Sequence, residues 1–92
     1  MAVIHMSREH NLSDEKAHEL AENVVSGLAK EFAVKYHWDN NIVKFKGAGA
    51  KGNMVLSPGL VELKMEVGFM LLPFKQKIEN AMIRRLDEFL SS

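Results

Sequence analysis

The stretch that most constrains the fold runs from Leu60 to Phe74, with the sequence LVELKMEVGFMLLPF. Its first half alternates strictly between apolar and charged side chains. The apolar positions are Val61, Leu63, Met65 and Val67, and the charged positions between them are Glu62, Lys64 and Glu66. Successive side chains of a strand point to opposite faces, so this alternation predicts a strand with one buried and one wet face.

The second half of the stretch is an apolar connector. Gly68 to Phe74 contains only apolar residues apart from Gly68 and Pro73, which interrupt regular structure. We interpret it as a link into a final helix, with Pro73 suited to the first turn of that helix. Two alternatives stay open. The connector belongs to the core, or Phe69 with Leu71 or Leu72 projects outward and forms an apolar patch that marks a partner, a lipid-like surface or a dimer contact.

The remaining periodicity predicts four more strands and two helices. The expected strands span residues 2–9, 35–38, 42–46, 53–57 and 60–67, and the expected helices span 14 to about 33 and about 74 to 90. Ser13 can cap the first helix, and Asp14 and Glu15 lie in its first turn, where the helix dipole favours negative charge. In the last helix Arg85 falls within the apolar stripe, so its guanidinium must reach water or a carboxylate.

These elements predict a single α+β domain over residues 1–92, in the order β-α-β-β-β-β-α. Two apolar helix stripes need a sheet face to cover, so we expect one antiparallel sheet of about five strands with both helices on the same side. The chain contains 47% hydrophobic residues and no cysteine, so aliphatic, Met and Phe packing must build the core without disulfides.

Charge and hydropathy narrow the classes of partner. Twelve basic and twelve acidic side chains give a net charge of zero. Net charge therefore gives no reason to expect nucleic acid or an anionic membrane as the main partner. The longest apolar run, 67–74, is far shorter than the roughly 20 residues of a membrane helix. We expect no signal peptide, no transmembrane segment and a cytoplasmic location. The sequence leaves the oligomeric state open, and a homo-oligomer is one of the states that it allows.

A local excess of positive charge lies between residues 35 and 51. Four lysines, Lys35, Lys44, Lys46 and Lys51, share this region with a single acid, Asp39. Together with Tyr36 and Trp38 nearby, these lysines are compatible with a surface that binds single-stranded nucleic acid. The favoured alternative is a solvated hairpin whose lysines guard against edge pairing, and we expect no specific nucleic-acid partner.

Two glycine features have structural interpretations. Gly47 to Gly52 matches G-x-G-x-x-G, but it precedes a predicted strand, whereas a dinucleotide site needs this loop to open a helix. We therefore interpret the whole segment as a flexible hairpin loop. Gly27 lies at the edge of the first helix's apolar stripe, where either close approach of a neighbouring strand or a surface position accounts for it.

No motif in the sequence predicts catalysis or metal binding. The four histidines, His5, His10, His18 and His37, lack the spacing of metal ligands, and no serine lies in a recognisable nucleophile motif. We expect no metal, no cofactor and no catalytic residue. One enzymatic hypothesis stays open: a hydrolase or isomerase that uses His10 with Arg8, where the first strand leads into the helix. A catalytic site can form from residues that are distant in the sequence and meet only in the folded structure, so the absence of a motif does not exclude it.

Short motifs along the whole chain resemble one family. They are Ile4-x-Met6-x-Arg8-x-His10-x-Leu12-Ser13, Ala17, the glycine-bearing hairpin ending at Gly52, Val67-Gly68-Phe69-Met70-Leu71, Ile78 and Leu86-Asp87. Together they resemble the polyhydroxyalkanoic acid system protein family. The resemblance implies a small bacterial protein linked by gene neighbourhood to polyester storage granules, and it supplies no catalytic residues. Val67 stands where the family pattern has Leu, which keeps the position apolar.

The leading functional hypothesis is a non-enzymatic module associated with polyhydroxyalkanoate granules that binds an apolar polymer surface or a granule protein. The candidate binding residues are Arg8, His10, Gly68, Phe69, Met70, Leu71 and Leu72. The alternative is a carrier that holds a small apolar, hydroxyacyl-like ligand between the sheet and the C-terminal helix. This second hypothesis is an analogy with other α+β folds.

Overall fold

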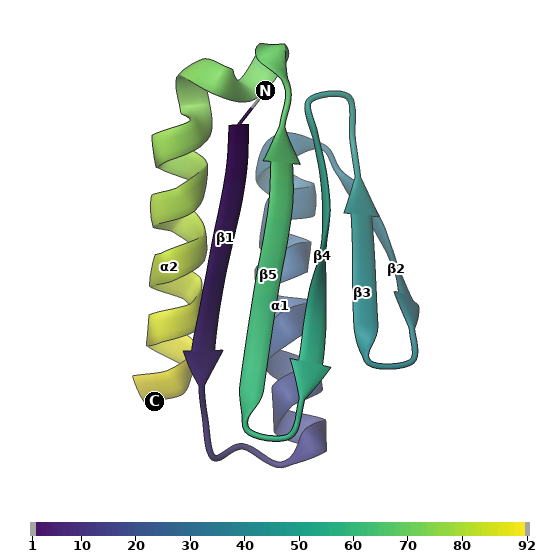
Figure 1. Cartoon of the computed structure of the whole chain (residues 1–92), viewed down its shortest axis with the longest axis vertical. Coiled ribbons are helices and arrows are strands. Elements are labelled where there is room, and N and C mark those ends of the chain that lie inside the picture. The colour runs from purple at the N-terminus through teal and green to yellow at the C-terminus, as the bar shows by residue number, and fades with distance from the viewer. Residues whose placement is uncertain (1, 92) are drawn as a thin grey trace.

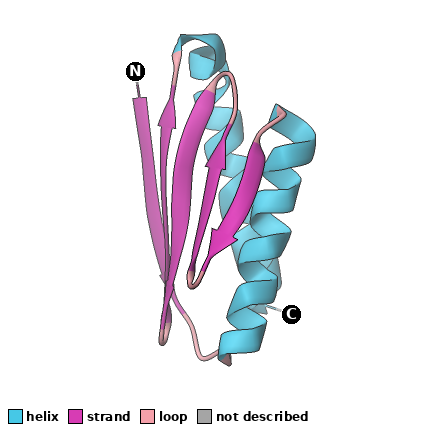
Figure 2. Ribbon diagram, turned by 90° about the vertical axis from the view of Figure 1, so that its right-hand side faces the viewer, coloured by secondary structure: helices cyan, strands magenta, loops and turns pink. Residues whose placement is uncertain are grey.

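A five-stranded antiparallel sheet carries two helices on one of its faces in the computed structural model, which describes residues 2–91 (Figure 1, Figure 2). The element order confirms the prediction of an α+β fold. The elements are β1 (Ala2–Glu9), α1 (Asp14–Phe32), β2 (Lys35–Asp39), β3 (Ile42–Lys46), β4 (Ala50–Ser57), β5 (Leu60–Val67), the 3₁₀ helix η1 (Phe69–Phe74) and α2 (Lys75–Ser91).

The strand order is β1-β5-β4-β3-β2, so the first strand of the chain pairs with the last. Their register runs from Ala2 opposite Val67 to Glu9 opposite Leu60. β5 is paired on both sides, and its apolar positions are buried beneath the helices at 0–1% exposure. The alternating segment from Val61 to Val67 therefore lies between β1 and β4, with Glu62, Lys64 and Glu66 on the open face of the sheet.

The core fills the space between the sheet and the helices. Met65 of β5 and Met82 of α2 are both fully buried there. A small hollow between α1 and α2, beside Gly27 and Arg85, has no room for a water molecule. The carrier hypothesis requires a cavity under α2, and the packing of these described residues counts against it.

Gly27 allows the two helices to approach closely. It is buried, and a Cβ atom built on it would lie 2.4 Å from Cζ of Arg85. The Arg85 side chain passes over this point and donates from Nη2 to Oε1 of Glu31 at 3.3 Å. Of the two partners expected for the Arg85 guanidinium, water or a carboxylate, the structure shows a carboxylate. The close neighbour of Gly27 is α2 rather than a strand.

The β3–β4 hairpin differs from the prediction in its length. β4 begins at Ala50, so only residues 47–49 form the loop and the interpretation of 50–52 as loop was wrong. Gly52 lies within β4, opposite Phe45 and Met65. A Cβ atom there would lie 2.2 Å from the carbonyl oxygen of Lys64. The last glycine of the G-x-G-x-x-G match therefore serves strand packing, and the match joins two strands instead of opening a helix.

The connector forms η1, and α2 begins one residue later than expected. Pro73 consequently lies inside η1 rather than in the first turn of α2. The amide of Lys75 donates to the carbonyl of Leu72, an i→i+3 bond that continues the 3₁₀ geometry up to α2. Among the described residues, no helix is both long enough and apolar enough to cross a membrane.

Candidate functional site

The two most exposed large apolar side chains of the described residues, Phe69 and Met70, lie in η1, and Phe74 of the same segment is also exposed. Phe69 is 84% exposed, Met70 70% and Phe74 48%. We call these three residues the apolar tip. They lie at the end of the molecule where β5 stops and α2 begins, at the top of Figure 1. Of the two alternatives for the connector, the structure shows the outward one for Phe69.

The rest of the connector anchors this segment. The amide of Gly68 donates to the carbonyl of Gly49 at 2.9 Å, and the amide of Leu71 donates to the carbonyl of Gly68 at 3.1 Å. Leu71 and Leu72 are partly buried against the core. Met70, rather than Leu71 or Leu72, therefore accompanies Phe69 outward. The apolar tip is presented by a segment that the backbone and two leucines hold in place.

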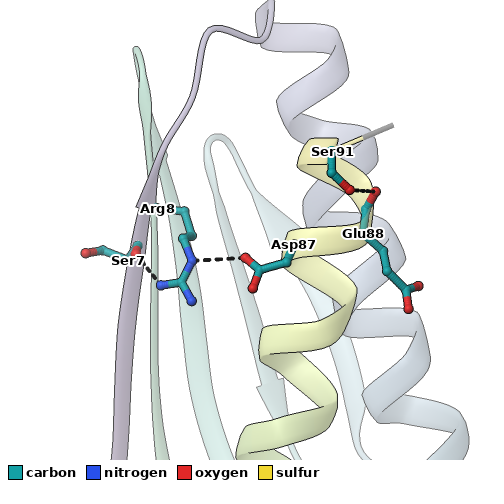
Figure 3. Close-up of polar contacts among 5 residues, drawn as sticks. All are labelled: Ser7, Arg8, Asp87, Glu88 and Ser91. Atoms are coloured by element: carbon teal, nitrogen blue, oxygen red, sulfur yellow. Dashed lines mark hydrogen bonds and ion pairs between the residues drawn. The ribbon is translucent and has the colours of Figure 1, made fainter.

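Arg8 joins β1 to α2 at the other end of the sheet (Figure 3). Its Nε donates to Oδ1 of Asp87 at 3.2 Å, and its Nη1 donates to the carbonyl of Ser7 at 2.9 Å. One turn further on, the Ser91 hydroxyl donates to the carbonyl of Glu88 at 3.3 Å. The Arg8 and Asp87 side chains are 34% and 57% exposed, so the pair contributes no more than about 1 kcal/mol to stability.

His10 closes the turn that follows β1. Its backbone amide donates to the carbonyl of Gly59 at 2.9 Å, and its Nδ1 accepts from the amide of Leu12 at 3.0 Å. Because Nδ1 accepts, a neutral ring carries its hydrogen on Nε2. That nitrogen is buried and has no hydrogen-bond partner in the described part of the chain. His10 is thus bonded to backbone and Arg8 to Asp87, with no bond joining them.

The candidate residues divide into two groups at opposite ends of the sheet. Arg8 pairs with Val61 at the start of β5, and Ala2 pairs with Val67 at its end, next to Gly68. Val67 lies six positions after Val61 in β5, which is about 20 Å at the usual strand rise of about 3.3 Å per residue. The structure therefore brings Gly68 to Leu72 together at one end and leaves Arg8 and His10 at the other.

Sequence reasoning missed a polar cluster between α1 and β2. The hydroxyl of Tyr36 donates to Oε2 of Glu22 at 2.5 Å, and Nε1 of Trp38 donates to Oε1 at 3.0 Å. The ring of His18 stacks on Trp38 at 4.8 Å. The bond from Tyr36, followed by that from Trp38, lowers the pKa of Glu22, and the bond to Glu22 raises the pKa of Tyr36. The alternation in β2 signals which side the aromatics take, but no sequence pattern identifies Glu22 as their partner.

This cluster separates the aromatic residues from the lysines of the same region. Tyr36 and Trp38 bond to α1. Lys35 alternates with these two residues in β2, and Lys44 and Lys46 alternate with buried residues in β3. The lysines therefore point to the open face of the sheet. A nucleic-acid face that combines aromatic stacking with lysines is therefore not assembled here. Within residues 2–91, no group of three or more His, Asp or Glu side chains is arranged to hold a metal ion.

Comparison with known proteins supplies the family. No curated protein matches the chain. A family model described as "Putative polyhydroxyalkanoic acid system protein" matches residues 4–90. The match begins in β1 and ends in the last turn of α2, so it covers the sheet, both helices and the apolar tip. The chain belongs to this polyhydroxyalkanoic acid system protein family.

Proposed function

We propose that this protein is a non-enzymatic module that attaches to the polyester surface of polyhydroxyalkanoate granules through its apolar tip. The observation that carries the proposal is the exposure of Phe69 and Met70 on an anchored segment. Membership of the polyhydroxyalkanoic acid system family supports the choice of an apolar polyester as the occupant.

The physical basis is the apolar surface that the tip leaves in water. Full burial of a Phe or Met side chain contributes about 1.5–3 kcal/mol. Phe69 and Met70 are mostly exposed and Phe74 is half exposed, so contact with an apolar phase offers roughly 3–6 kcal/mol before the costs of association. A free energy of about −4 kcal/mol corresponds to a millimolar dissociation constant. Attachment by one copy is therefore weak and reversible.

The anchoring of the segment lowers the cost of attachment. Leu71 and Leu72 pack against the core, and Gly68 is bonded to the β3–β4 loop. Because the backbone of the tip is already ordered, binding does not require a loop to fold, and less of the gross interaction is lost to ordering. Phe69 and Met70 meet the polymer as an ordered pair.

The test is co-sedimentation of the purified protein with protein-free polyhydroxyalkanoate particles. We expect Phe69→Ser combined with Met70→Ser to weaken binding at least tenfold, since each lost side chain removes about 1.5 kcal/mol or more. Both residues project into solvent, so the melting temperature should change little. Leu71 is left intact because it packs beside Gly49.

Val3→Ser is the matched control. Val3 is 51% exposed but lies on β1, outside the tip, so its replacement should leave sedimentation unchanged. Undiminished binding of the double variant would refute the role of the tip. Binding to native granules but not to protein-free particles would identify a granule protein as the partner and refute the polymer as the occupant.

A further inference from the structure

The open face of the sheet, turned away from both helices, carries a concentration of lysines. In the strand register, Lys35 of β2 lies opposite Lys46 of β3, which in turn lies opposite Lys51 of β4. A second row, two residues along, contains Lys44 of β3 and Lys64 of β5. We call these five lysines the lysine face. The second row is completed by His37 and Asn53.

The charges on the lysine face are incompletely balanced. Lys44 lies 4.0 Å from Asp39 and Lys51 lies 3.6 Å from Glu66. The other three lysines, Lys35, Lys46 and Lys64, form no ion pair with any described residue. Like charges directly opposite each other across strands are destabilising. The chain has as many acids as bases, so folding alone gives no reason to gather lysines in adjacent pairs.

The same face is hollowed into a trough. Its volume is about 790 Å³, and all five lysines line it together with Tyr36, His37, Phe45, Gly52, Asn53, Met65 and Glu66. Sites for small molecules have volumes of roughly 300–1,000 Å³. The trough is large enough for an extended ligand that crosses several strands.

Spacing and composition indicate the class of anion. Neighbouring strands lie about 4.8 Å apart, so the first row offers a lysine about every 5 Å. One strand of nucleic acid carries a phosphate charge every 3.4 Å along its axis, whereas side chains on one face of an extended peptide repeat only about every 6.6 Å. The lysine spacing lies about midway between these two repeats, so charge density distinguishes the ligands. A phosphate chain places about twice as many negative charges along the row as an acidic peptide does, and it is therefore the better electrostatic match for the lysine face.

The position of the aromatic side chains argues against nucleic acid as the source of that phosphate chain. Base stacking on aromatic rings is the usual means of holding single strands. Tyr36 and Phe45 border the trough, but the Tyr36 hydroxyl and Nε1 of Trp38 bond to Glu22 on the opposite side of the sheet, and Phe45 is buried. Lysine binds phosphate as a point charge without further geometric demands. We propose that the lysine face binds linear inorganic polyphosphate, which lies across β2 to β5 between the two rows of lysines.

The test is direct titration of the protein with polyphosphate of defined length. If three or four phosphates are neutralised, a slope of about −0.7 per contact predicts a 20- to 50-fold loss of affinity between 50 and 200 mM salt. We expect Lys35→Gln with Lys46→Gln to weaken binding at least fivefold at 50 mM salt. The same double variant removes a like-charged pair, so its melting temperature should be retained or raised.

The matched control changes the same net charge on another surface. Lys16→Gln with Lys30→Gln removes two exposed lysines of α1 and should leave polyphosphate binding within twofold. Polyglutamate and oligo(dT), compared at equal charge concentration, should bind more weakly than polyphosphate. Equal or tighter binding of either polymer, an equal effect of the α1 variant, or no binding at 50 mM salt would overturn the proposal. None of these outcomes depends on the apolar tip.

Discussion

Replacing Gly52 by Ala tests the packing of the sheet at its centre. The added Cβ atom would lie 2.2 Å from the carbonyl oxygen of Lys64, 2.7 Å from Cα of Met65 and 3.0 Å from the ring of Phe45. Two of these three atoms belong to the backbone of β5, which is paired on both sides. They cannot move away as the end of a flexible side chain could.

The size of the effect follows from these distances. Overpacking a close-packed site costs about 1–3 kcal/mol, and the rigid backbone contact places Gly52→Ala at the upper end. Removing a glycine from a strand recovers about 0.5–1 kcal/mol. The net loss is about 2 kcal/mol, which lowers the melting temperature of a domain of this size by roughly 8–16 °C.

The assay is thermal unfolding followed by circular dichroism, with Gly68→Ala as the control. At Gly68 the nearest heavy atom to an added Cβ is the carbonyl oxygen of Gly49 at 3.6 Å, an ordinary contact. The φ angle of −83° suits alanine, so the melting temperature should stay unchanged or rise slightly. A Gly52→Ala protein as stable as the wild type would contradict the register of β4 against β5.

Three further predictions concern polar contacts and the helix crossing. The chain contains one tyrosine, so absorbance at 295 nm should report phenolate formation by Tyr36 above pH 10, and Glu22→Gln should move that midpoint down; an unchanged midpoint would contradict the raised pKa of Tyr36. Because the folded-state pKa of Glu22 is lowered, its stabilising contribution is present above about pH 4.5 and disappears as the pH falls through the folded-state pKa. The stability difference between wild type and Glu22→Gln in urea should therefore shrink in acid, and a constant difference would count against the cluster. Asp87→Asn should cost no more than about 1 kcal/mol, and a loss above 2 kcal/mol would mean that the partly exposed Arg8 pair contributes more than its geometry allows. Gly27→Ala should change stability by less than about 1 kcal/mol, because the displaced atoms are the mobile end of Arg85 and helix propensity improves; a loss as large as that of Gly52→Ala would show that Arg85 cannot move.

The sequence predicts most of this fold because its apolar periodicities are strong. Strict alternation in Leu60–Val67 and the helical stripes of α1 and α2 each identify an element and its buried face. The start of β4 was missed because Ala50, Lys51 and Gly52 have the composition of a loop. Their strand conformation comes from pairing with Met65 to Val67 of β5, a contact that local propensity does not contain.

The candidate site could be predicted only in part. The apolar run Phe69 to Leu72 has no periodicity, so nothing in it distinguishes the outward Phe69 and Met70 from the anchoring Leu71 and Leu72. Their separation depends on where Gly68 bonds to Gly49, which is a tertiary contact. The wide separation of Arg8 and His10 from the tip likewise follows from the pairing of β1 with β5, which joins the two ends of the chain.

The most direct test of attachment through the tip uses a single environment-sensitive label. The chain has no cysteine, so Phe69→Cys and Glu88→Cys each accept one thiol-reactive fluorophore, the first in the tip and the second near the far end of α2 (Figure 1). When polyhydroxyalkanoate particles are added, the label at position 69 should shift its emission to the blue and become protected from iodide quenching, while the label at 88 stays unchanged. A label at 69 that remains fully quenchable on protein that sediments with the polymer would contradict the proposed mode of attachment.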